Sequence, residues 1–272
     1  MSVKLNQIVI GDNNPFVLIA GPCVVENKKM IFETALAIKQ IASELDIPFI
    51  FKSSFKKANR TNLKSFTGLG DKESVAILKK VREQLNLSVV TDIHTESDVD
   101  MVADAVDILQ IPAFLSRQTD LLISAGKSGK VVNIKKGQFL APEDMKHAVD
   151  KVASTGNNNI MLTERGTTFG YHNLVVDMRS LVIMRELGYP VVMDATHAVQ
   201  LPSKDLISGG QPKFIKPLAR AAMAVGIDAL FLEVHPDPKN ALSDAASQLP
   251  LGELKELLIE MKQIDQIIKN KK

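Results

Sequence analysis

Eight short apolar runs divide this chain, and each ends in polar or charged residues. Strands that are covered on both faces read as continuous apolar runs, and strands alternating with helices indicate βαβ units. Eight such units predict a (β/α)8 barrel, whose active site lies at the carboxyl ends of the strands. The runs are FVLIA (16–20), FIFK (49–52), SVVTD (88–92), ILQ (108–110), VVNIK (131–135), IMLTE (160–164), VVMDA (191–195) and ALFLE (229–233).

The length of the chain fits such a barrel without a second domain. Its 272 residues are close to the roughly 250 typical of the fold, so we expect residues 1–272 to form a single TIM-barrel domain. Residues 3–10 alternate apolar and polar side chains and predict a short β-hairpin within residues 1–12 that plugs the barrel bottom. Helices are expected at residues 27–45, 71–86, 95–105, 119–128, 141–155, 173–187, 214–226 and 250–269.

Composition argues against several classes of protein. The net charge is only +2, and the chain has no Trp and two Tyr, so no nucleic-acid partner is expected. No apolar run approaches the roughly 20 residues that cross a membrane, and residues 1–14 lack the apolar core of a secretion signal. The single cysteine, Cys23, cannot form an intramolecular disulfide, which favours a reducing cytoplasmic location.

Several cations stand at the predicted strand ends. Lys52, Lys135 and Arg165 each close or follow an apolar run. Like charges gathered at one barrel mouth repel one another, and an anionic ligand is the usual compensation; Arg in particular suits phosphate or carboxylate. Lys56 and Lys136 can equally be read as solvated basic side chains. The pattern predicts a substrate with two or more anionic groups.

A second group of strand-end residues has the character of metal ligands. Sulfur, imidazole nitrogen and carboxylate oxygen together suit a borderline divalent ion such as Zn2+, Fe2+ or Mn2+. The ends of strands one, seven and eight are neighbours in a closed barrel, so these side chains could meet. His94 and His235 are competing candidates at other strand ends. The set is Cys23, His197, Glu233 and Asp244.

The motifs at these positions resemble one enzyme family over residues 5–268, the 3-deoxy-D-manno-octulosonate 8-phosphate synthases. A related enzyme that uses erythrose 4-phosphate typically carries Lys-Pro-Arg-Thr where this chain has Lys57-Ala58-Asn59-Arg60-Thr61. The resemblance rests on LIAGPC, FKSSFKKANRT, TDIHT, LQIPAFLSRQTDL, NIKKGQF, TERGTTFGYHNLVVDMRSL, DATHAVQLP and FLEVHPDP.

The resemblance implies condensation of phosphoenolpyruvate with D-arabinose 5-phosphate and water, in lipopolysaccharide precursor synthesis. It also implies a homotetramer in which a neighbouring subunit completes the pentose phosphate site. Asp92 would either contact the sugar or order the site. The phosphate of phosphoenolpyruvate would be held by Lys135, Arg165 and the backbone near Ala113. Its carboxylate and enol region would be surrounded by Lys52, Ser54, Lys57 and Gln110. The pentose phosphate would be held by Asn59, Arg60 and Thr61. The candidate catalytic residues are Lys52, Lys57, Asp92, His197 and Asp244.

The family has a metal-independent class with Asn after the first strand and a metal-dependent class with Cys there. With Cys23, this chain resembles the second class, in which the ion would orient the aldehyde or lower the pKa of a bound water. Two departures from the family pattern stand out. Ala245-Ala246 replaces an expected turn pair, so the loop carrying Asp244 is expected to be more mobile or differently shaped. His172 replaces Asn, either tuning phosphate binding or facing solvent.

Three alternatives stay open on the sequence. Lys52 or Lys135 could serve a Schiff-base aldolase. A non-catalytic barrel that binds a phosphosugar would need gaps among the charged strand-end residues, and the matched positions show none. A metal-dependent hydrolase would be expected to use several His ligands, whereas only His197 fits the set.

Overall fold

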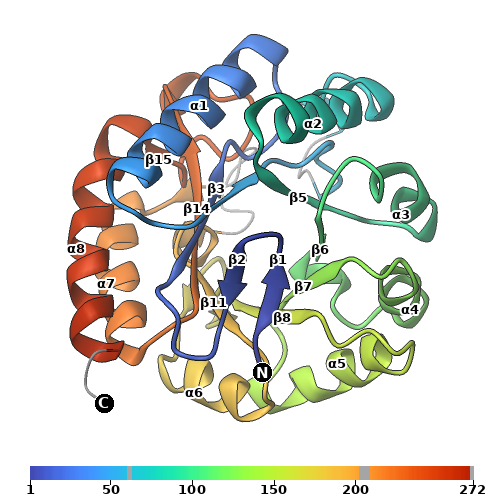
Figure 1. Ribbon diagram of the computed structural model, residues 1–272, viewed down its shortest axis with the longest axis vertical. Helices are drawn as coiled ribbons and strands as arrows, with labels where there is room; N and C mark the ends of the chain where they lie inside the picture. Colours follow the sequence, from blue (N-terminus) through green and yellow to red (C-terminus); the bar gives the residue numbers. More distant parts are fainter. Residues whose placement is uncertain (60–62, 202–208, 270–272) are drawn as a thin grey trace.

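The computed structural model describes residues 1–59, 63–201 and 209–269. Within these residues, eight parallel strands close into a barrel with helices around it (Figure 1), which confirms the predicted (β/α)8 fold. The last barrel strand pairs in parallel with both the first and the seventh, and these pairings close the ring. The barrel strands are β3 (Val17–Gly21), β4 (Phe49–Lys52), β5 (Ser88–Asp92), β6 (Ile108–Ile111), β7 (Val131–Lys135), β8 (Ile160–Glu164), β11 (Val191–Asp194) and β14 (Ala229–His235).

A helix lies within each of the ranges expected from the sequence. Their apolar faces pack on the outward-facing side chains of the strands in one large hydrophobic cluster. None of the described helices is both long and apolar enough to cross a membrane. The helices are α1 (Lys28–Glu44), α2 (Asp71–Leu85), α3 (Glu96–Val102), α4 (Thr119–Lys127), α5 (Met145–Ala153), α6 (Arg179–Glu186), α7 (Ile215–Val225) and α8 (Leu251–Lys269).

The helix expected at residues 173–187 begins six residues late, and this expectation was wrong for 173–178. Two of these residues form β10 (Leu174–Val175), which pairs antiparallel with β9 (Thr167–Thr168). The Asp177 carboxylate accepts a hydrogen bond from the Arg179 backbone N–H at 3.0 Å, which satisfies a free donor at the new helix start. The helix-like apolar spacing therefore extends into a segment whose residues Leu174 and Val175 pair as a strand.

The N-terminal hairpin closes one end of the barrel. Strands β1 (Val3–Leu5) and β2 (Ile8–Ile10) pair antiparallel, and the hairpin lies across the middle of the ring in Figure 1. Val3, Leu5 and Ile10 are buried in one cluster with the inward-facing apolar side chains of the strands. The hairpin therefore plugs the barrel bottom, as its alternating pattern predicts.

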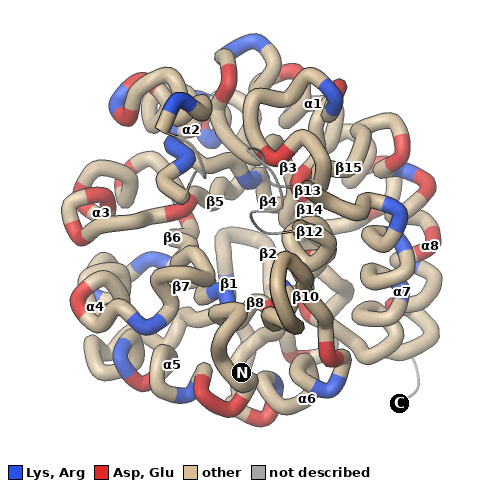
Figure 2. Tube along the Cα trace, turned by 180° about the vertical axis from the view of Figure 1, so that it is seen from behind, with Lys and Arg blue, Asp and Glu red and all other residues tan. Residues whose placement is uncertain are grey.

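The barrel interior changes from apolar to polar within two residues along several strands. Side chains two positions apart on a strand share a face, so the residues that follow the inward apolar layer by two also point inward. These pairs are Ile50 and Lys52, Val90 and Asp92, Ile108 and Gln110, Val131 and Asn133, Val192 and Asp194, and Phe231 and Glu233. Figure 2, turned to view the opposite end, shows charges of both signs over the outer helices. The chemically distinctive charges are the buried ones at the carboxyl ends of the strands.

Candidate functional site

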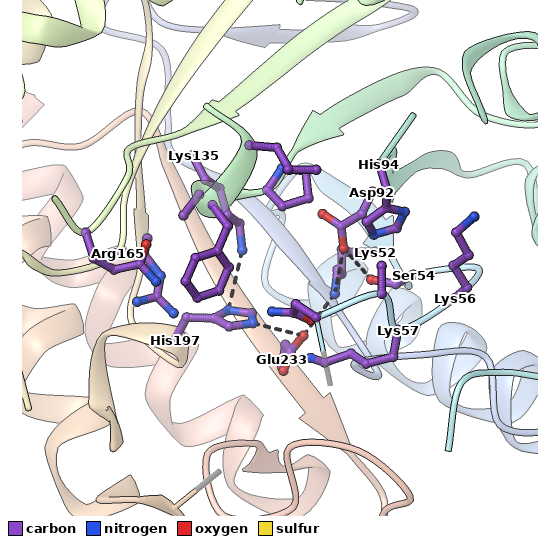
Figure 3. Close-up of a pocket in the computed structure, with 17 residues that line it drawn as sticks. Lys52, Ser54, Lys56, Lys57, Asp92, His94, Lys135, Arg165, His197 and Glu233 are labelled. Carbon is purple, nitrogen blue, oxygen red and sulfur yellow. Dashed lines mark hydrogen bonds and ion pairs between the residues drawn. The ribbon is translucent and has the colours of Figure 1, made fainter. Parts of the chain in front are cut away.

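A cavity of about 290 Å3 lies at the carboxyl end of the barrel. In Figure 3 its labelled side chains come from different strands and loops and converge on one space. Most of the residues singled out in the sequence line it. They are Lys52, Ser54, Lys57, Asn59, Asp92, Ala113, Lys135, Arg165, His197 and Glu233.

The remaining predicted residues lie elsewhere. Cys23 and Asp244 are buried beside Lys57 and Glu233. Gln110 is fully buried behind Asp92. Arg60 and Thr61 lie outside the described residues.

Four of the five described cations that line the cavity are paired with carboxylates, among them Lys56, whose ammonium lies 3.1 Å from Asp98 Oδ1. The ammonium of Lys52 lies 2.9 Å from Glu233 Oε1, and that of Lys135 lies 2.6 Å from Asp194 Oδ2. Lys57 forms a close ion pair with Asp244. These pairs offset much of the repulsion expected from the sequence, which did not anticipate how many acids end neighbouring strands.

Arg165 differs from these lysines. Its side chain is 4% exposed, yet no carboxylate of the described residues forms an ion pair with it within 4.0 Å. One guanidinium nitrogen donates to Gln200 Oε1 at 2.9 Å, and the other terminal nitrogen is buried without a partner. A buried cation with a free donor is a suitable partner for an anionic ligand in the cavity.

The charges of the mouth stabilise one another. Burial alone would lower the pKa of Lys52, but the Glu233 and Asp92 carboxylates outweigh this effect and raise it. Burial alone would raise the pKa of Asp194, but His197 and Lys135 hold it well below its ordinary range. Both groups are therefore charged near neutral pH.

Four side chains gather as possible metal ligands. Ligand atoms of Cys23, Glu233 and Asp244 all lie within 4.8 Å of one another. His197 Nε2 lies 3.4 Å from Glu233 Oε1 and 4.0 Å from Asp244 Oδ2. Glu233 Oε2 is buried without a hydrogen-bond partner, and burial raises the pKa of the Cys23 thiol well above its ordinary value, with a further contribution from Glu233. A divalent cation would satisfy the free oxygen and favour the thiolate, so the donor set fits such an ion.

The local sequence explains why Cys23 reaches this cluster. A Cβ added to Gly21 would lie 2.1 Å from the Lys52 carbonyl oxygen, so only glycine allows β3 and β4 to approach so closely there. The Cys23 carbonyl then accepts hydrogen bonds from the Ser54 N–H and the Lys52 ammonium, both at 3.1 Å. The Gly-Pro-Cys motif thus fixes the cysteine beside the lysine of the next strand.

A row of hydrogen-bonded polar side chains runs along the neighbouring strands β5, β6, β7 and β8. Gln110 donates to Asp92 Oδ1 at 2.6 Å and accepts from Asn133 at 2.9 Å, and Asn133 accepts from Thr163 at 2.7 Å. This arrangement gives Gln110 a supporting place behind Asp92. Asn133 and Thr163 were missed in the sequence, although both stand two positions beyond inward apolar residues.

Asp194 is a third site residue that was not predicted from the sequence. Its Oδ2 lies 2.6 Å from both Lys135 Nζ and His197 Nδ1, and its Oδ1 accepts the His197 N–H at 2.9 Å. A buried carboxylate that holds the second ring nitrogen of a metal-ligating His is a common arrangement. Asp194 connects the possible metal ligands to the cationic side of the mouth.

The other histidines singled out in the sequence take different positions. His94 lines the cavity, and its Nδ1 lies 3.4 Å from the Asp98 carboxylate. His235 Nδ1 accepts the Asp237 N–H at 3.0 Å, and its Nε2 faces Glu26 at 3.5 Å. His172 is exposed in a turn with φ of +54°. Neither His94 nor His235 takes the place of His197 in the cluster.

The loop that carries Asp244 forms a defined turn despite the Ala245-Ala246 departure. Asp244 has φ of +46°, and its carbonyl accepts the Ser247 N–H at 3.0 Å. A Cβ on Gly210 would lie 2.3 Å from the Ala246 carbonyl oxygen, so the two segments pack tightly. These contacts form the turn with Ala245-Ala246 in place of the expected turn pair.

Known proteins resemble this chain along almost its whole length. The model of the DAHP synthetase I family matches residues 1–270. A 2-dehydro-3-deoxyphosphooctonate aldolase from Syntrophotalea carbinolica is 58% identical over 269 residues, covering 98% of this chain and 97% of that protein. Proteins of the same name from Aromatoleum aromaticum and Geotalea uraniireducens are 55% and 53% identical, each over 98% of this chain and 97% and 98% of their own lengths.

Asp194 generates a pH-dependent prediction. An unfolded Asp has a pKa of about 3.9, whereas the pKa of Asp194 in the folded protein is well below its ordinary range. At acidic pH the unfolded state therefore binds more protons, so this stabilisation is complete above about pH 5 and decreases as the pH falls. We expect Asp194→Asn to reduce the free energy of unfolding by about 3 kcal/mol at pH 7. The difference from wild type should narrow below pH 4, by up to about 1.4 kcal/mol per pH unit.

Urea unfolding followed from pH 7 to pH 3.5 measures this difference. Asp100→Asn, at an exposed position on α3, is the matched control and should leave the curve unchanged. A difference between wild type and Asp194→Asn that stays constant with pH would contradict the assigned ionisation.

Proposed function

This chain belongs to the DAHP synthetase I family, and we propose that its barrel mouth condenses phosphoenolpyruvate with D-arabinose 5-phosphate and water. The products are 3-deoxy-D-manno-octulosonate 8-phosphate, a lipopolysaccharide precursor, and inorganic phosphate. The relatives' name is a synonym of 3-deoxy-D-manno-octulosonate 8-phosphate synthase, so the resemblance inferred from the motifs is confirmed. The observation that carries the proposal is the convergence of Lys52, Lys135 and Arg165 on one cavity in a chain 58% identical to such an enzyme.

The cations suit the anionic groups of phosphoenolpyruvate. Arg165 has a free buried donor, and with Lys135 it would bind the phosphate, helped by the backbone at Ala113. Lys52 and Lys57 would face the carboxylate. The exposed Asn59 lines the outer part of the cavity, where the pentose phosphate would bind together with Arg60 and Thr61.

The reaction makes one carbon–carbon bond and one carbon–oxygen bond to water, and it breaks the carbon–oxygen bond to phosphate. Carbon 3 of phosphoenolpyruvate attacks the aldehyde carbon of the pentose, and water adds at carbon 2. The resulting tetrahedral intermediate expels phosphate and becomes the ketone. Positive charge develops at carbon 2 and negative charge on the aldehyde oxygen, and fixed charges in the mouth would stabilise both. The nearby carboxylates, Asp92 and Glu233, can support the positive centre, while the lysines can support the oxygen.

The state of Lys52 argues against the Schiff-base alternative. A lysine that attacks a carbonyl must lose its proton, and enzymes achieve this by lowering its pKa. Burial here is outweighed by Glu233 and Asp92, which raise the pKa of Lys52. Lys135 is likewise engaged by Asp194 at 2.6 Å. Both are better suited to bind anions than to act as nucleophiles.

We further propose that a divalent ion is held by Cys23, His197, Glu233 and Asp244. When bound, such an ion acts as a Lewis acid or activates water. The support is the mixed donor set, the partnerless Glu233 oxygen and the Asp194 contact that orients His197. Lys57 contacts both Cys23 Sγ, at 3.2 Å, and Asp244, so its positive charge already compensates two of these donors.

Exposed apolar side chains at the mouth support the proposed homotetramer. Phe114, Phe139, Phe169 and Tyr171 lie on successive loops after β6, β7 and β8, and each is more than half exposed. Association between subunits would remove these rings from water. Light scattering should give a particle of about four times the 29.8 kDa chain mass, and a monomer would contradict the proposal.

We also propose a cytoplasmic location, because Cys23 must stay reduced to serve as a ligand. Cell fractionation tests this point.

The reaction itself is tested with purified full-length protein. Phosphate release from phosphoenolpyruvate should require arabinose 5-phosphate, and the eight-carbon product should appear in equal amount. Erythrose 4-phosphate should be turned over much more slowly, and borohydride should trap no covalent adduct. A preference for erythrose 4-phosphate would move the chain to the other branch of the family, and a trapped lysine adduct would favour the Schiff-base mechanism.

Metal dependence is tested by chelation and by direct metal analysis. EDTA should abolish activity, and added Mn2+ or Zn2+ should restore it. Cys23→Ala should weaken metal affinity by more than about 100-fold, because loss of a ligand should exceed the 10- to 100-fold typical of groups behind the ligands. Chelator competition measures that affinity without reference to activity. Ser243→Ala is the matched control, since its hydroxyl lies 3.4 Å from Cys23 Sγ without belonging to the donor set. Equal metal content in wild type and Cys23→Ala would contradict the proposed site.

A further inference from the structure

Lys136 is a fully buried lysine that lies outside the lining of the cavity. It follows Lys135 at the end of β7, and successive side chains of an extended strand point to opposite faces. Lys135 points into the barrel mouth, whereas Lys136 points away from it and is 0% exposed. Burial of an ammonium is unfavourable unless it is paired and hydrogen bonded. The contacts of Lys136 therefore indicate what its charge does.

The Lys136 ammonium joins three segments behind the cavity. It donates to Thr167 Oγ1 at 2.9 Å, on β9. It also donates to the carbonyl oxygens of Gly137 and Leu140, at 3.4 and 3.3 Å, in the loop after β7. Its charge lies 3.6 Å from Glu164 Oε1 at the end of β8. One buried cation thus ties the loop after β7 to the segment after β8.

Glu164 continues this network to the backbone of Arg165. Its Oε1 accepts the N–H groups of Arg165 and Gly166 at 2.9 and 2.6 Å, and its Oε2 accepts the Ser180 hydroxyl at 2.6 Å. Glu164 is 1% exposed. The buried pair therefore holds the backbone on both sides of Arg165, between the Glu164 carboxylate and the Thr167 hydroxyl.

We propose that Lys136 and Glu164 are positioning residues that hold Arg165 in place to bind the phosphate of phosphoenolpyruvate. The inference rests on the phosphate-binding role proposed above for Arg165. Arg165 has only Gln200 as a side-chain partner among the described residues, so its direction depends on how firmly its backbone is held. Displacement of a binding group by about 1 Å can cost two orders of magnitude in rate.

Thr167→Val is the substitution expected to disturb the fold least. Thr167 is exposed, and valine removes the hydroxyl that accepts from Lys136 without a change in side-chain shape. The KM for phosphoenolpyruvate should rise about 3- to 10-fold, the range expected from one lost hydrogen bond. Thr167→Ser keeps the hydroxyl and should restore the wild-type value. Lys136→Met, which removes the ammonium but keeps the rest of the unbranched side chain, should raise that KM by at least about 10-fold. In each variant the KM for arabinose 5-phosphate should stay within about 2-fold of wild type.

Binding of inorganic phosphate to the full-length protein, measured by calorimetry, should weaken in parallel. Lys130→Met makes the same substitution just before β7, at the opposite end of the strand. It should change neither the KM for phosphoenolpyruvate nor the affinity for inorganic phosphate. A general loss of order would raise the KM for phosphoenolpyruvate and the KM for arabinose 5-phosphate together, and that outcome would overturn the proposal. If Lys136→Met is unstable, Thr167→Val supplies the same comparison.

A double-mutant cycle separates this inference from the role of Arg165. Arg165→Gln alone should raise the KM for phosphoenolpyruvate, and adding Thr167→Val should produce little further increase, because the hydroxyl acts through Arg165. Independent effects that multiply would overturn the positioning role while leaving Arg165 as the phosphate ligand. If Arg165→Gln leaves that KM unchanged, the proposed phosphate role fails, and this inference fails with it.

Discussion

Buried ion pairs between distant strands hold the barrel mouth together. Lys52 on β4 meets Glu233 on β14, and Lys135 on β7 meets Asp194 on β11. Each member is almost fully buried, so removing one would leave an uncompensated charge and cost about 3–5 kcal/mol. Each pair joins strands that are far apart in the sequence but separated by only one strand in the barrel. The charges of the site therefore depend on the order in which these strands pair.

The apolar layer beneath these charges strengthens their electrostatic interactions. Phe231 lies under the mouth, with the ammonium of Lys135 4.0 Å and that of Lys52 5.6 Å from the ring centroid. The N-terminal hairpin closes the barrel below this layer and keeps water from the floor. Electrostatic interactions weaken in water and strengthen as it is excluded. A sealed floor is therefore part of what allows the charges to act on substrate.

The strands and the charged residues at their ends could be predicted because both follow from local patterns, whereas residues such as Ser54, Asn59 and Ala113 were expected only from the family resemblance. Continuous apolar runs mark strands buried on both faces, and the residues at their ends must lie at one mouth. The non-helical segment 173–178 could not be predicted in this way, since its apolar spacing fits a helix until the Thr167–Thr168 strand offers it a partner. Pairing between segments is a tertiary property that overrides local periodicity.

Some functional neighbours were missed although the sequence contains a signal for them. Asn133 and Asp194 each stand two positions after an inward-facing valine, so strand alternation places both inside the mouth. The same alternation places the side chains of Lys135 and Lys136 on opposite faces of the strand, although the two residues are adjacent in the sequence. The partners of these residues could not be predicted. That Asp194 would meet both Lys135 and His197 depends on the ring geometry, which no local pattern encodes.

The charge balance of the mouth indicates how the proposed ion would affect substrate binding. Five described cations line the cavity, and carboxylates already form ion pairs with all of them except Arg165, which reduces the net attraction that these cations offer to phosphoenolpyruvate. A divalent ion at the donor set would change this balance in favour of an anion while satisfying the free Glu233 oxygen. The ion would also bind Asp244, which is now paired with Lys57, so the Lys57 ammonium could interact more strongly with the carboxylate of phosphoenolpyruvate. The cations are Lys52, Lys56, Lys57, Lys135 and Arg165, and the carboxylates paired with the lysines are Asp71, Asp92, Asp98, Asp194, Glu233 and Asp244. Metal binding and substrate binding should therefore strengthen each other through these shared residues.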